Sequence, residues 1–360
     1  MGITQWLAGK KKEDAKIHSS QDFRKEKTGP APRIPYVTDA IAFPYLGPVS
    51  IYYITLLIFF FLFIFTKSGL VGLLAGINIV FIVMWEFYSG SKEGNIKNEL
   101  KDTAIAIFLG LVVWFGSGFL LNTPTPINAI VSCSMLPVYE RGDMVILQGG
   151  EVKTQYLQYA GSLNDINLST VAYYQNQSVK VNGSIYSYCS TIPSGSSKIC
   201  DAFRTEPYNF YETHGPLKIE YGACVKYYSK DGKEQIQPCV KKTYFQEKEI
   251  SFDKNAELIV YQPKKGDVYA LVGDIVHRVR FAINASDGII YFTKGDNNPI
   301  YDFQYYFQSY KMGNSPVQKN QIKGRIIVRI PFLGNFKLFI TPDILFLDEG
   351  QTGCNAYFVS

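Results

Sequence analysis

Three long, uncharged runs of mostly apolar residues occupy much of the first third of the chain. They cover residues 40–66, 68–85 and 104–121. A membrane-spanning helix takes about 20 apolar residues, and each run is close to that length. The runs therefore predict three transmembrane helices, at 40–66, 68–88 and 104–121. The alternative is three buried helices of a large soluble core, which is disfavoured because such helices usually keep a polar face.

The distribution of positive charge predicts the orientation of these helices. Residues 1–39 carry the stretches GKKKEDAK and FRKEKTGPAPR, and their composition predicts a disordered basic tail. The loop after the second run, SGSKEGNIKNELKD, holds three lysines. Lysine and arginine concentrate on the cytoplasmic side of membranes, so both segments are expected inside and everything after Asn122 outside. Lys67, in the short outer loop, opposes this orientation.

The net charge of +5 lies largely on these inner segments and suits contact with anionic lipid. No basic, aromatic-rich motif of the kind that binds nucleic acid is present, so we expect no nucleic-acid partner. We also expect no cofactor and no metal site.

Two features of the outer segment agree with an oxidising, extracellular setting. Asn-x-Ser sequons begin at Asn167, Asn176, Asn182 and Asn284. Four of the six cysteines cluster without any Cys-x-x-Cys spacing, at Cys189, Cys200, Cys224 and Cys239. This pattern predicts two disulfides. Pairing in sequence order would close loops of about 10 to 15 residues, each contributing roughly 3 kcal/mol to stability. A zinc site is the alternative, but the spacing is against it.

Beyond the third run the sequence has a β pattern. AIVSCSMLPV, DMVILQ, ELIVY, DIVHRVRF, GIIYFTK and IKGRIIVRI are short apolar or alternating segments that predict strands. They divide into 122–148 and 256–340, separated by a Tyr-, Ser- and Asn-rich insertion at 149–255 that contains the clustered cysteines. The tail at 341–360 is partly apolar, and the sequence leaves open whether it contacts the membrane or the β domain.

Histidine usage narrows the search for a chemical site. Of the three histidines, His18 lies in the inner tail, His214 in a loop of the insertion, and His277 on the predicted strand IVHRVRF. A base on a strand is well placed for proton transfer, although a histidine of a β core would look the same. Ser134, in SCSMLPVYERGD, is a candidate nucleophile, and the alternative for it is a serine that forms local hydrogen bonds in a turn.

Four segments in this order resemble the sequence boxes of type I signal peptidases. SCSMLPVYERGDMVIL is similar to the Ser-x-Ser-Met-x-Pro box, and KKGDVYALVGDIVHRV is similar to the following Gly-Asp-Val strand and the strand that bears the base. TKGDNNPIYD is similar to the Lys-Gly-Asp-Asn-Asn signature, and IKGRIIVRIPFLG to the closing strand. His277, where bacterial enzymes carry lysine, resembles the archaeal and endoplasmic-reticulum branch. Together the boxes cover about a third of the chain.

The resemblance implies a role for each matching residue. Ser134 would be the nucleophile and His277 the general base, with Asp302 orienting the imidazole as an acid does in serine hydrolases. Asp296 would hold the loops of the site together. The backbone N–H of Ser134 and the hydroxyl of Ser132 would bind the oxyanion.

Two departures from the family pattern stand out. Cys133 replaces the usual glycine between the two serines, which leaves Cys133 open as an alternative nucleophile. The insertion at 149–255 has no role that the sequence assigns.

The resemblance implies a membrane-anchored, mainly-β serine endopeptidase: three transmembrane helices followed by a signal-peptidase-type β domain with a large β-rich insertion. It would remove signal peptides from exported preproteins at the outer face of the cell membrane of an archaeon. Preproteins, membrane lipid and the protein translocation channel are the implied partners. The alternatives are a catalytically inactive surface scaffold with the same fold, and a protease of this fold with regulatory substrates.

Overall fold

The computed structural model describes residues 40–43, 47–66, 69–92, 96–166, 169–175, 177–251, 253, 255–340 and 354–359. The chain divides into two compact units, 1–50 and 51–360. In the described part of the first unit, strands β1 (Ala40–Phe43) and β2 (Gly47–Ser50) pair antiparallel. The predicted basic tail at 1–39, with His18, lies outside the described residues.

Three apolar helices open the second unit: α1 (Ile51–Thr66), α2 (Gly69–Lys92) and α3 (Ile96–Leu120). The range 40–66, predicted as one helix, is helical only from Ile51, because the residues before it form β1 and β2. Within α3, the stretch Thr103–Leu120 is long and apolar enough to cross a membrane, whereas Ile51–Phe63 and Leu70–Trp85 are shorter apolar stretches.

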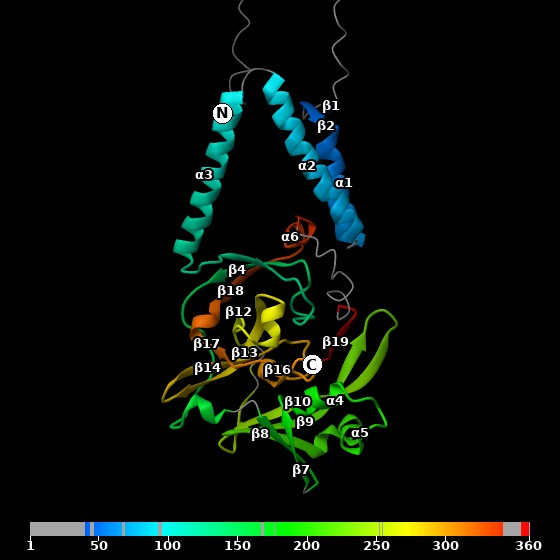
Figure 1. Ribbon diagram of the computed structural model, residues 1–360, viewed down its shortest axis with the longest axis vertical. Coiled ribbons are helices and arrows are strands. Elements are labelled where there is room, and N and C mark those ends of the chain that lie inside the picture. Colours follow the sequence, from blue (N-terminus) through cyan, green and yellow to red (C-terminus); the bar gives the residue numbers. More distant parts are fainter. Residues whose placement is uncertain are drawn as a thin grey trace, which may run out of the picture. The chain divides into compact units, whose positions relative to one another are not determined.

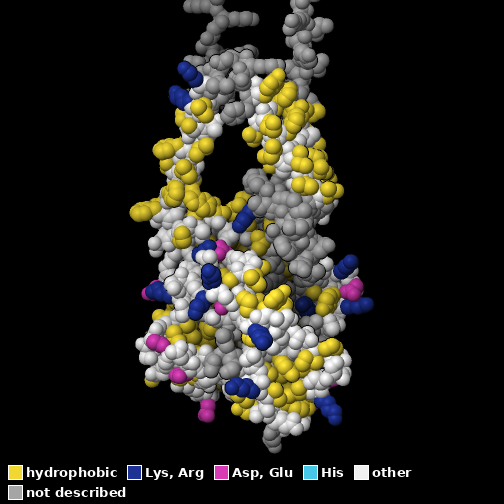
Figure 2. Space-filling model, in the orientation of Figure 1, with side chains coloured by type: hydrophobic (Ala, Val, Ile, Leu, Met, Phe, Trp, Pro, Cys, Tyr) yellow, Lys and Arg dark blue, Asp and Glu magenta, His cyan; other side chains and the backbone are white. Residues whose placement is uncertain are grey.

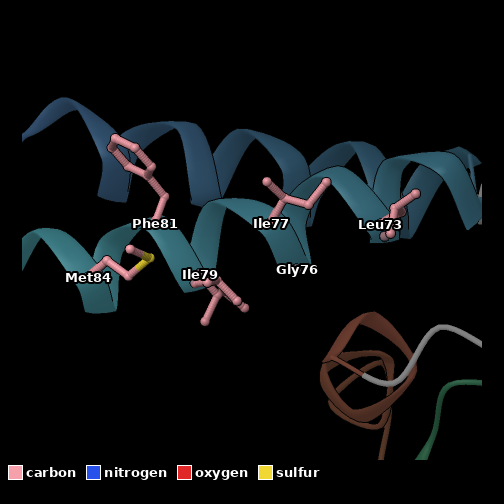
Figure 3. A pocket seen from close by; sticks show the side chains of 8 residues that line it. Leu73, Gly76, Ile77, Ile79, Phe81 and Met84 are labelled. Atoms are coloured by element: carbon pink, nitrogen blue, oxygen red, sulfur yellow. The ribbon is translucent and has the colours of Figure 1, made fainter.

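Packing between α1 and α2 leaves most of their apolar surface uncovered. Phe63 and Ala75 are buried, and Asn78 donates a hydrogen bond to the Thr55 hydroxyl at 2.9 Å. A second face of α2 forms an open apolar hollow over Gly72 and Gly76 (Figure 3). On the face drawn in Figure 2, hydrophobic side chains cover the helices, and most charged side chains lie on the β-rich part.

An eight-stranded sheet carries the predicted catalytic strands (Figure 1). Its strands run in the order β17 (Val317–Gln318), β14 (Gly288–Lys294), β13 (Ile275–Ala285), β12 (Leu258–Tyr261), β18 (Ile322–Ile330), β4 (Met144–Gln148) and β3 (Ile127–Ala129), with β5 (Tyr156–Gln158) parallel to β13. The sheet is curled, so that strands distant in sequence face one another. The strand predicted at AIVSCSMLPV is extended only at its start, because the chain turns after β3.

Six strands of the insertion and one strand from the end of the chain form a second, seven-stranded sheet. Its order is β11 (Lys248–Glu249), β10 (Lys233–Phe245), β9 (Leu217–Tyr228), β8 (Phe210–His214), β6 (Ser169–Tyr174) and β7 (Gln177–Asn182), and β19 (Ala356–Phe358) adds to β9. Helices α4 (Ile185–Ser190) and α5 (Lys198–Thr205) pack beside it. Disulfides Cys189–Cys200 and Cys224–Cys239 confirm the pairing predicted in sequence order.

The two sheets share one apolar core. Phe281 and Phe292 of the catalytic sheet stack with ring centroids 4.5 Å apart, and they belong to the same buried cluster as Leu217 and Ile219 of the insertion. The insertion is therefore packed onto the catalytic sheet through side chains that neither sheet could bury alone.

The remaining elements are the 3-10 helices η1 (Leu163–Asp165), η2 (Pro207–Asn209), η3 (Val268–Leu271), η4 (Asp302–Gln304) and η5 (Lys319–Gln321), strands β15 (Tyr306–Phe307) and β16 (Met312–Gly313), and α6 (Asn335–Ile340).

The structure describes only part of the predicted glycosylation sequons and part of the C-terminal tail. Of the sequons, Asn182 is exposed at the end of β7, and Asn284 is half-buried and donates to Gln158, while Asn167 and Asn176 lie outside the described residues. The end of the chain is placed by β19, which pairs with the insertion, but 341–353 lie outside the described residues.

Candidate active site

The predicted nucleophile Ser134 lies in the turn between β3 and β4. Its neighbours Cys133 and Met135 are buried, at 6% and 1% exposure, so the turn directs the side chain of Ser134 the other way. The carbonyl oxygen of Ser134 accepts a hydrogen bond from the backbone N–H of Asn297 at 2.7 Å. The turn is thus anchored by the buried side chains of Cys133 and Met135, and Ser134 between them is half-exposed.

His277, on β13, lies within hydrogen-bonding distance of that hydroxyl. Its Nε2 is 2.9 Å from the Oγ of Ser134, although the two residues are 143 positions apart in sequence. Its Nδ1 is 2.7 Å from Oδ2 of Asp302. Imidazole that donates from Nδ1 to a carboxylate has Nε2 free to accept a proton, which is the arrangement that activates a serine hydroxyl. The structure therefore brings the three predicted residues into one hydrogen-bonded chain.

Asp302 begins the 3-10 helix η4 and is almost completely buried. Besides His277, its Oδ2 accepts from the Tyr261 hydroxyl at 2.9 Å and from the Thr293 hydroxyl at 2.6 Å. Burial, reinforced by the Asp302 carboxylate, raises the pKa of Tyr261 well above its usual range, so this phenol stays a donor. Three partners converging on one oxygen fix the direction of the carboxylate.

Among the described residues, the hydrogen bonds of the Asp296 carboxylate go to arginine side chains and to none of Ser134, His277 and Asp302. Arg278 donates to Asp296 from Nε at 3.0 Å and from a terminal nitrogen at 2.8 Å, and Arg280 donates at 2.8 Å. These ion pairs link β13 to the loop after β14. The role predicted for Asp296, holding the loops of the site together, stays a prediction.

Ser132 is exposed, and its Oγ lies 3.2 Å from the Oγ of Ser134. A hydroxyl beside the nucleophile is in reach of an oxyanion formed there. Its role as an oxyanion donor stays a prediction.

Gly295 is a site residue that was not singled out from the sequence. A Cβ atom at this position would lie 2.8 Å from Nε2 of His277 and 2.7 Å from the carbonyl oxygen of Ser134. Both distances are shorter than real Cβ contacts, so only glycine fits between these groups without a shift. The Lys-Gly-Asp signature in TKGDNN contained the signal that could have identified it.

A second group missed from the sequence anchors the nucleophile turn to the end of the chain. Cys133 forms a disulfide with Cys354. Asn297 donates from Nδ2 to the carbonyl oxygens of Cys133 at 3.0 Å and Ala356 at 2.8 Å, and its Oδ1 accepts from the N–H of Phe358 at 3.1 Å. The alternative of Cys133 as nucleophile is wrong for this state, because its sulfur is bonded to another sulfur.

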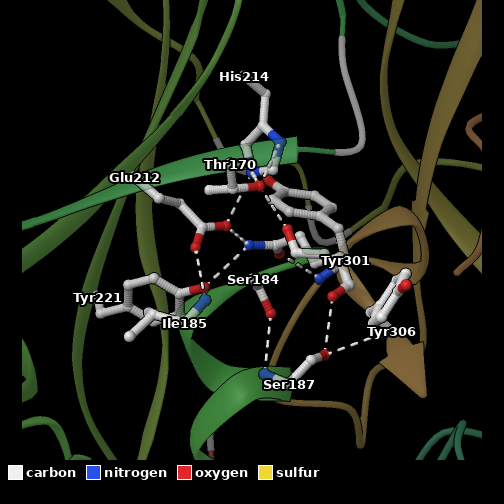
Figure 4. A network of polar contacts seen from close by, with 11 residues as sticks. Thr170, Ser184, Ile185, Ser187, Glu212, His214, Tyr221, Tyr301 and Tyr306 are labelled. Atoms are coloured by element: carbon white, nitrogen blue, oxygen red, sulfur yellow. Dashed lines mark hydrogen bonds and ion pairs between the residues drawn. The ribbon is translucent and has the colours of Figure 1, made fainter. Parts of the chain in front are cut away.

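The other histidine on the outer side, His214, belongs to a separate buried network. Its Nε2 is 2.9 Å from Oε1 of Glu212, and its Nδ1 is 3.2 Å from the hydroxyl of Thr170 (Figure 4). His214 is therefore occupied within the insertion, and the imidazole next to Ser134 is that of His277.

Lys294, at the end of β14, is a buried lysine close to the site. Burial and the nearby positive charge of Arg280 lower its pKa to about 7, although Asp296 and Asp302 act in the opposite direction. Its Nζ has one hydrogen bond among those identified in the described residues, a long one of 3.4 Å to the carbonyl oxygen of Gly295. Near neutral pH, Lys294 is therefore poised between its charged and neutral forms.

No group of three or more His, Cys, Asp or Glu side chains that could hold a metal ion occurs among the described residues. All six cysteines are in disulfides, so the zinc alternative for the clustered cysteines does not apply. Comparison with protein-family models finds no match to the chain, and comparison with curated proteins finds none either.

Proposed function

We propose that this chain is a membrane-bound serine endopeptidase that removes N-terminal signal peptides from exported preproteins. The observation that carries the proposal is the hydrogen-bonded chain Ser134–His277–Asp302, with distances of 2.9 Å and 2.7 Å. The four sequence boxes that resemble type I signal peptidases supply the substrate class.

In the proposed reaction, Ser134 Oγ attacks the carbonyl carbon of the scissile peptide bond while His277 Nε2 takes the hydroxyl proton. Asp302 stabilises the imidazolium that forms and keeps Nε2 directed at the serine. The backbone N–H of Ser134 and the hydroxyl of Ser132 stabilise the oxyanion. His277 then gives its proton to the leaving amine, and a water molecule releases the acyl group from Ser134 by the reverse steps.

The apolar helices favour a substrate presented at a membrane. The end of α3 at Leu120 lies only 14 residues before Ser134 (134 − 120). Signal peptides carry an apolar segment followed by a small-residue cleavage site, so a membrane-tethered hydroxyl meets the scissile bond close to the membrane surface. We propose that three transmembrane helices anchor the protein in the cell membrane and that its catalytic domain is extracellular. We also propose that the protein contacts membrane lipid and the translocation channel.

The test compares wild-type protein with Ser134→Ala and His277→Ala, each purified in detergent and offered a preprotein with a small-x-small cleavage site. Wild type should cut at that site, and both variants should lose at least about a thousandfold in rate, as when serine-hydrolase catalytic residues are removed. No cleavage by wild type, or equal cleavage by all three, would reject the assignment and favour an inactive scaffold. Cleavage of internal sites in folded proteins, with preproteins untouched, would indicate regulatory substrates.

A further inference from the structure

We propose that the insertion is part of the catalytic centre: through Glu212 and Gln304 it holds η4, and with it Asp302, in the orientation that His277 requires. This inference rests on the proposed function, because it assigns positioning residues to that site. It gives a role to 149–255.

Gln304, at the end of η4 and two residues after Asp302, is completely buried and is held from the insertion side. Its Nε2 donates to Oε1 of Glu212 and, at 3.0 Å, to the hydroxyl of Tyr221. Its carbonyl oxygen accepts from the Ser187 hydroxyl at 2.8 Å. Figure 4 shows these groups converging from the strands and helix α4 of the insertion.

The same amide also fixes the backbone on the other side of Asp302. Oε1 of Gln304 accepts from the N–H of Tyr301 at 2.8 Å. Gln304 therefore bridges the residue before Asp302 and the carboxylate of Glu212. A rotation of η4 that moved Asp302 away from His277 would break hydrogen bonds in a fully buried region, which is costly.

Glu212 has the partners that a rigid anchor needs. Its side chain is 0% exposed, and Oε1 also lies 2.9 Å from Nε2 of His214. Its Oε2 accepts from the N–H of Ile185, at the start of α4, at 3.1 Å. A buried carboxylate is tolerated only when donors surround it, and breaking such a set is strongly destabilising locally.

Apolar contacts restrain the middle of η4. The ring of Phe303 packs edge-on against the rings of His214 and Phe292, with centroids 4.9 Å and 5.1 Å apart, respectively. From the catalytic side, Asn314 donates to the carbonyl oxygen of Asp302 at 3.0 Å. All three residues of η4 are thus fixed, and the insertion binds the last one, Gln304, at its side-chain Nε2 and its backbone carbonyl oxygen.

The decisive variant is Glu212→Gln, which keeps the shape but replaces one of the two acceptor oxygens with an N–H₂ group, so that at least one of the three nitrogen partners Gln304, His214 and Ile185 loses its acceptor. The matched control is Glu220→Gln on the neighbouring strand β9, whose half-buried carboxylate pairs with Lys218 and makes no contact with η4. We expect Glu212→Gln to lower kcat about tenfold with KM unchanged, the usual scale for residues that orient an active group. The control should match wild type in both constants.

A second measurement does not depend on proteolysis. The chain has only three histidines, so a ¹³C-histidine NMR titration resolves them, with the variants His18→Gln and His277→Gln used for assignment. If Asp302 is displaced, it stabilises the imidazolium of His277 less, and the titration midpoint of His277 and the acidic limb of the rate profile both move to lower pH. A loss of global stability alone would move neither.

If Glu212→Gln does not fold, it is replaced by Gln304→Met, which removes only the bridging amide. We expect the same fall in kcat and the same shift of the His277 titration in this variant. Unchanged kcat and an unchanged His277 titration in a folded variant would overturn the positioning role. A wild type that cuts no preprotein would overturn the proposed function instead, and the titration shift would still report on whether the insertion positions Asp302.

Discussion

At the level of single residues, Gly295 occupies a position beside Ser134 and His277 that has no room for a side chain. We expect Gly295→Ala to lower kcat about a hundredfold, because a methyl group 2.8 Å from His277 Nε2 and 2.7 Å from the Ser134 carbonyl must push one of them away. Steady-state kinetics on a preprotein measure the effect. The matched control is Gly110→Ala in α3, where a Cβ meets no atom within 4 Å. Equal activity of the two variants would mean that the turn and the imidazole adjust freely.

Lys294 makes stability depend on pH in a predictable direction. Its pKa is about 7 in the folded chain and near its ordinary 10.5 when unfolded, so between these values the unfolded state binds more protons. Stability therefore rises with pH from about 7 to 10, by up to roughly 1 kcal/mol per pH unit, and the contribution is lost as pH falls through 7.

Lys294→Met removes this dependence. Compared with the variant, wild type should gain stability between pH 7 and pH 9 when unfolding is followed by circular dichroism in detergent. The same pH dependence in both proteins would show that Lys294 is charged, or solvated, in the folded chain.

At the level of elements, the nucleophile turn is clamped to the end of the chain. The Cys133–Cys354 disulfide joins positions 221 residues apart, and the side chain of Asn297 holds the same two segments together by hydrogen bonds. A cross-link that closes so long a loop stabilises a fold by about 4 kcal/mol or more in the chain-entropy account.

We expect the double variant Cys133→Ser, Cys354→Ser to lose both stability and kcat, the latter several-fold, because the freed turn carries Ser134. The control removes Cys189 and Cys200, whose disulfide joins α4 to α5 across a sequence separation of 11. That control should lose stability, by about 3 kcal/mol, but keep its kcat at temperatures where it is folded. A kcat that falls equally in both would contradict a special role for the first disulfide.

Elements with a strong local signal were predictable, and long-range closures were not. The alternation in IVHRVRF and GIIYFTK specifies β13 and β14, and the serine box places Ser134 after a strand. Pairing of Cys189 with Cys200 follows from proximity in sequence. Cys133 and Cys354 have no such signal, because their meeting depends on the whole fold. The same holds for Gln304 and Glu212, which are 92 positions apart.

At the level of the whole molecule, the proposed three-span topology makes a prediction that a single spanning helix does not. The native cysteines are all in disulfides, so cysteines introduced one at a time report only their own position. With three spans, a membrane-impermeant maleimide added to intact cells should label Asn182→Cys, on the exposed end of β7, and Ser68→Cys, at the first residue of the second apolar run. It should label Lys11→Cys, in the basic tail, only after permeabilisation.

Ser68→Cys is the discriminating probe. If only α3 crosses the membrane, the chain before it stays on one side, so Ser68→Cys and Lys11→Cys should behave alike, while Asn182→Cys is still labelled from outside. Labelling of all three in detergent controls for reactivity. Three spans place the helical hairpin of α1 and α2 in the lipid, where its exposed apolar side chains, such as Phe65 at 83% exposure, no longer face water. If Ser68→Cys is not labelled in intact cells, the loop between α1 and α2 is not outside. The two helices would then not cross the membrane as proposed, and the three-span topology would be contradicted.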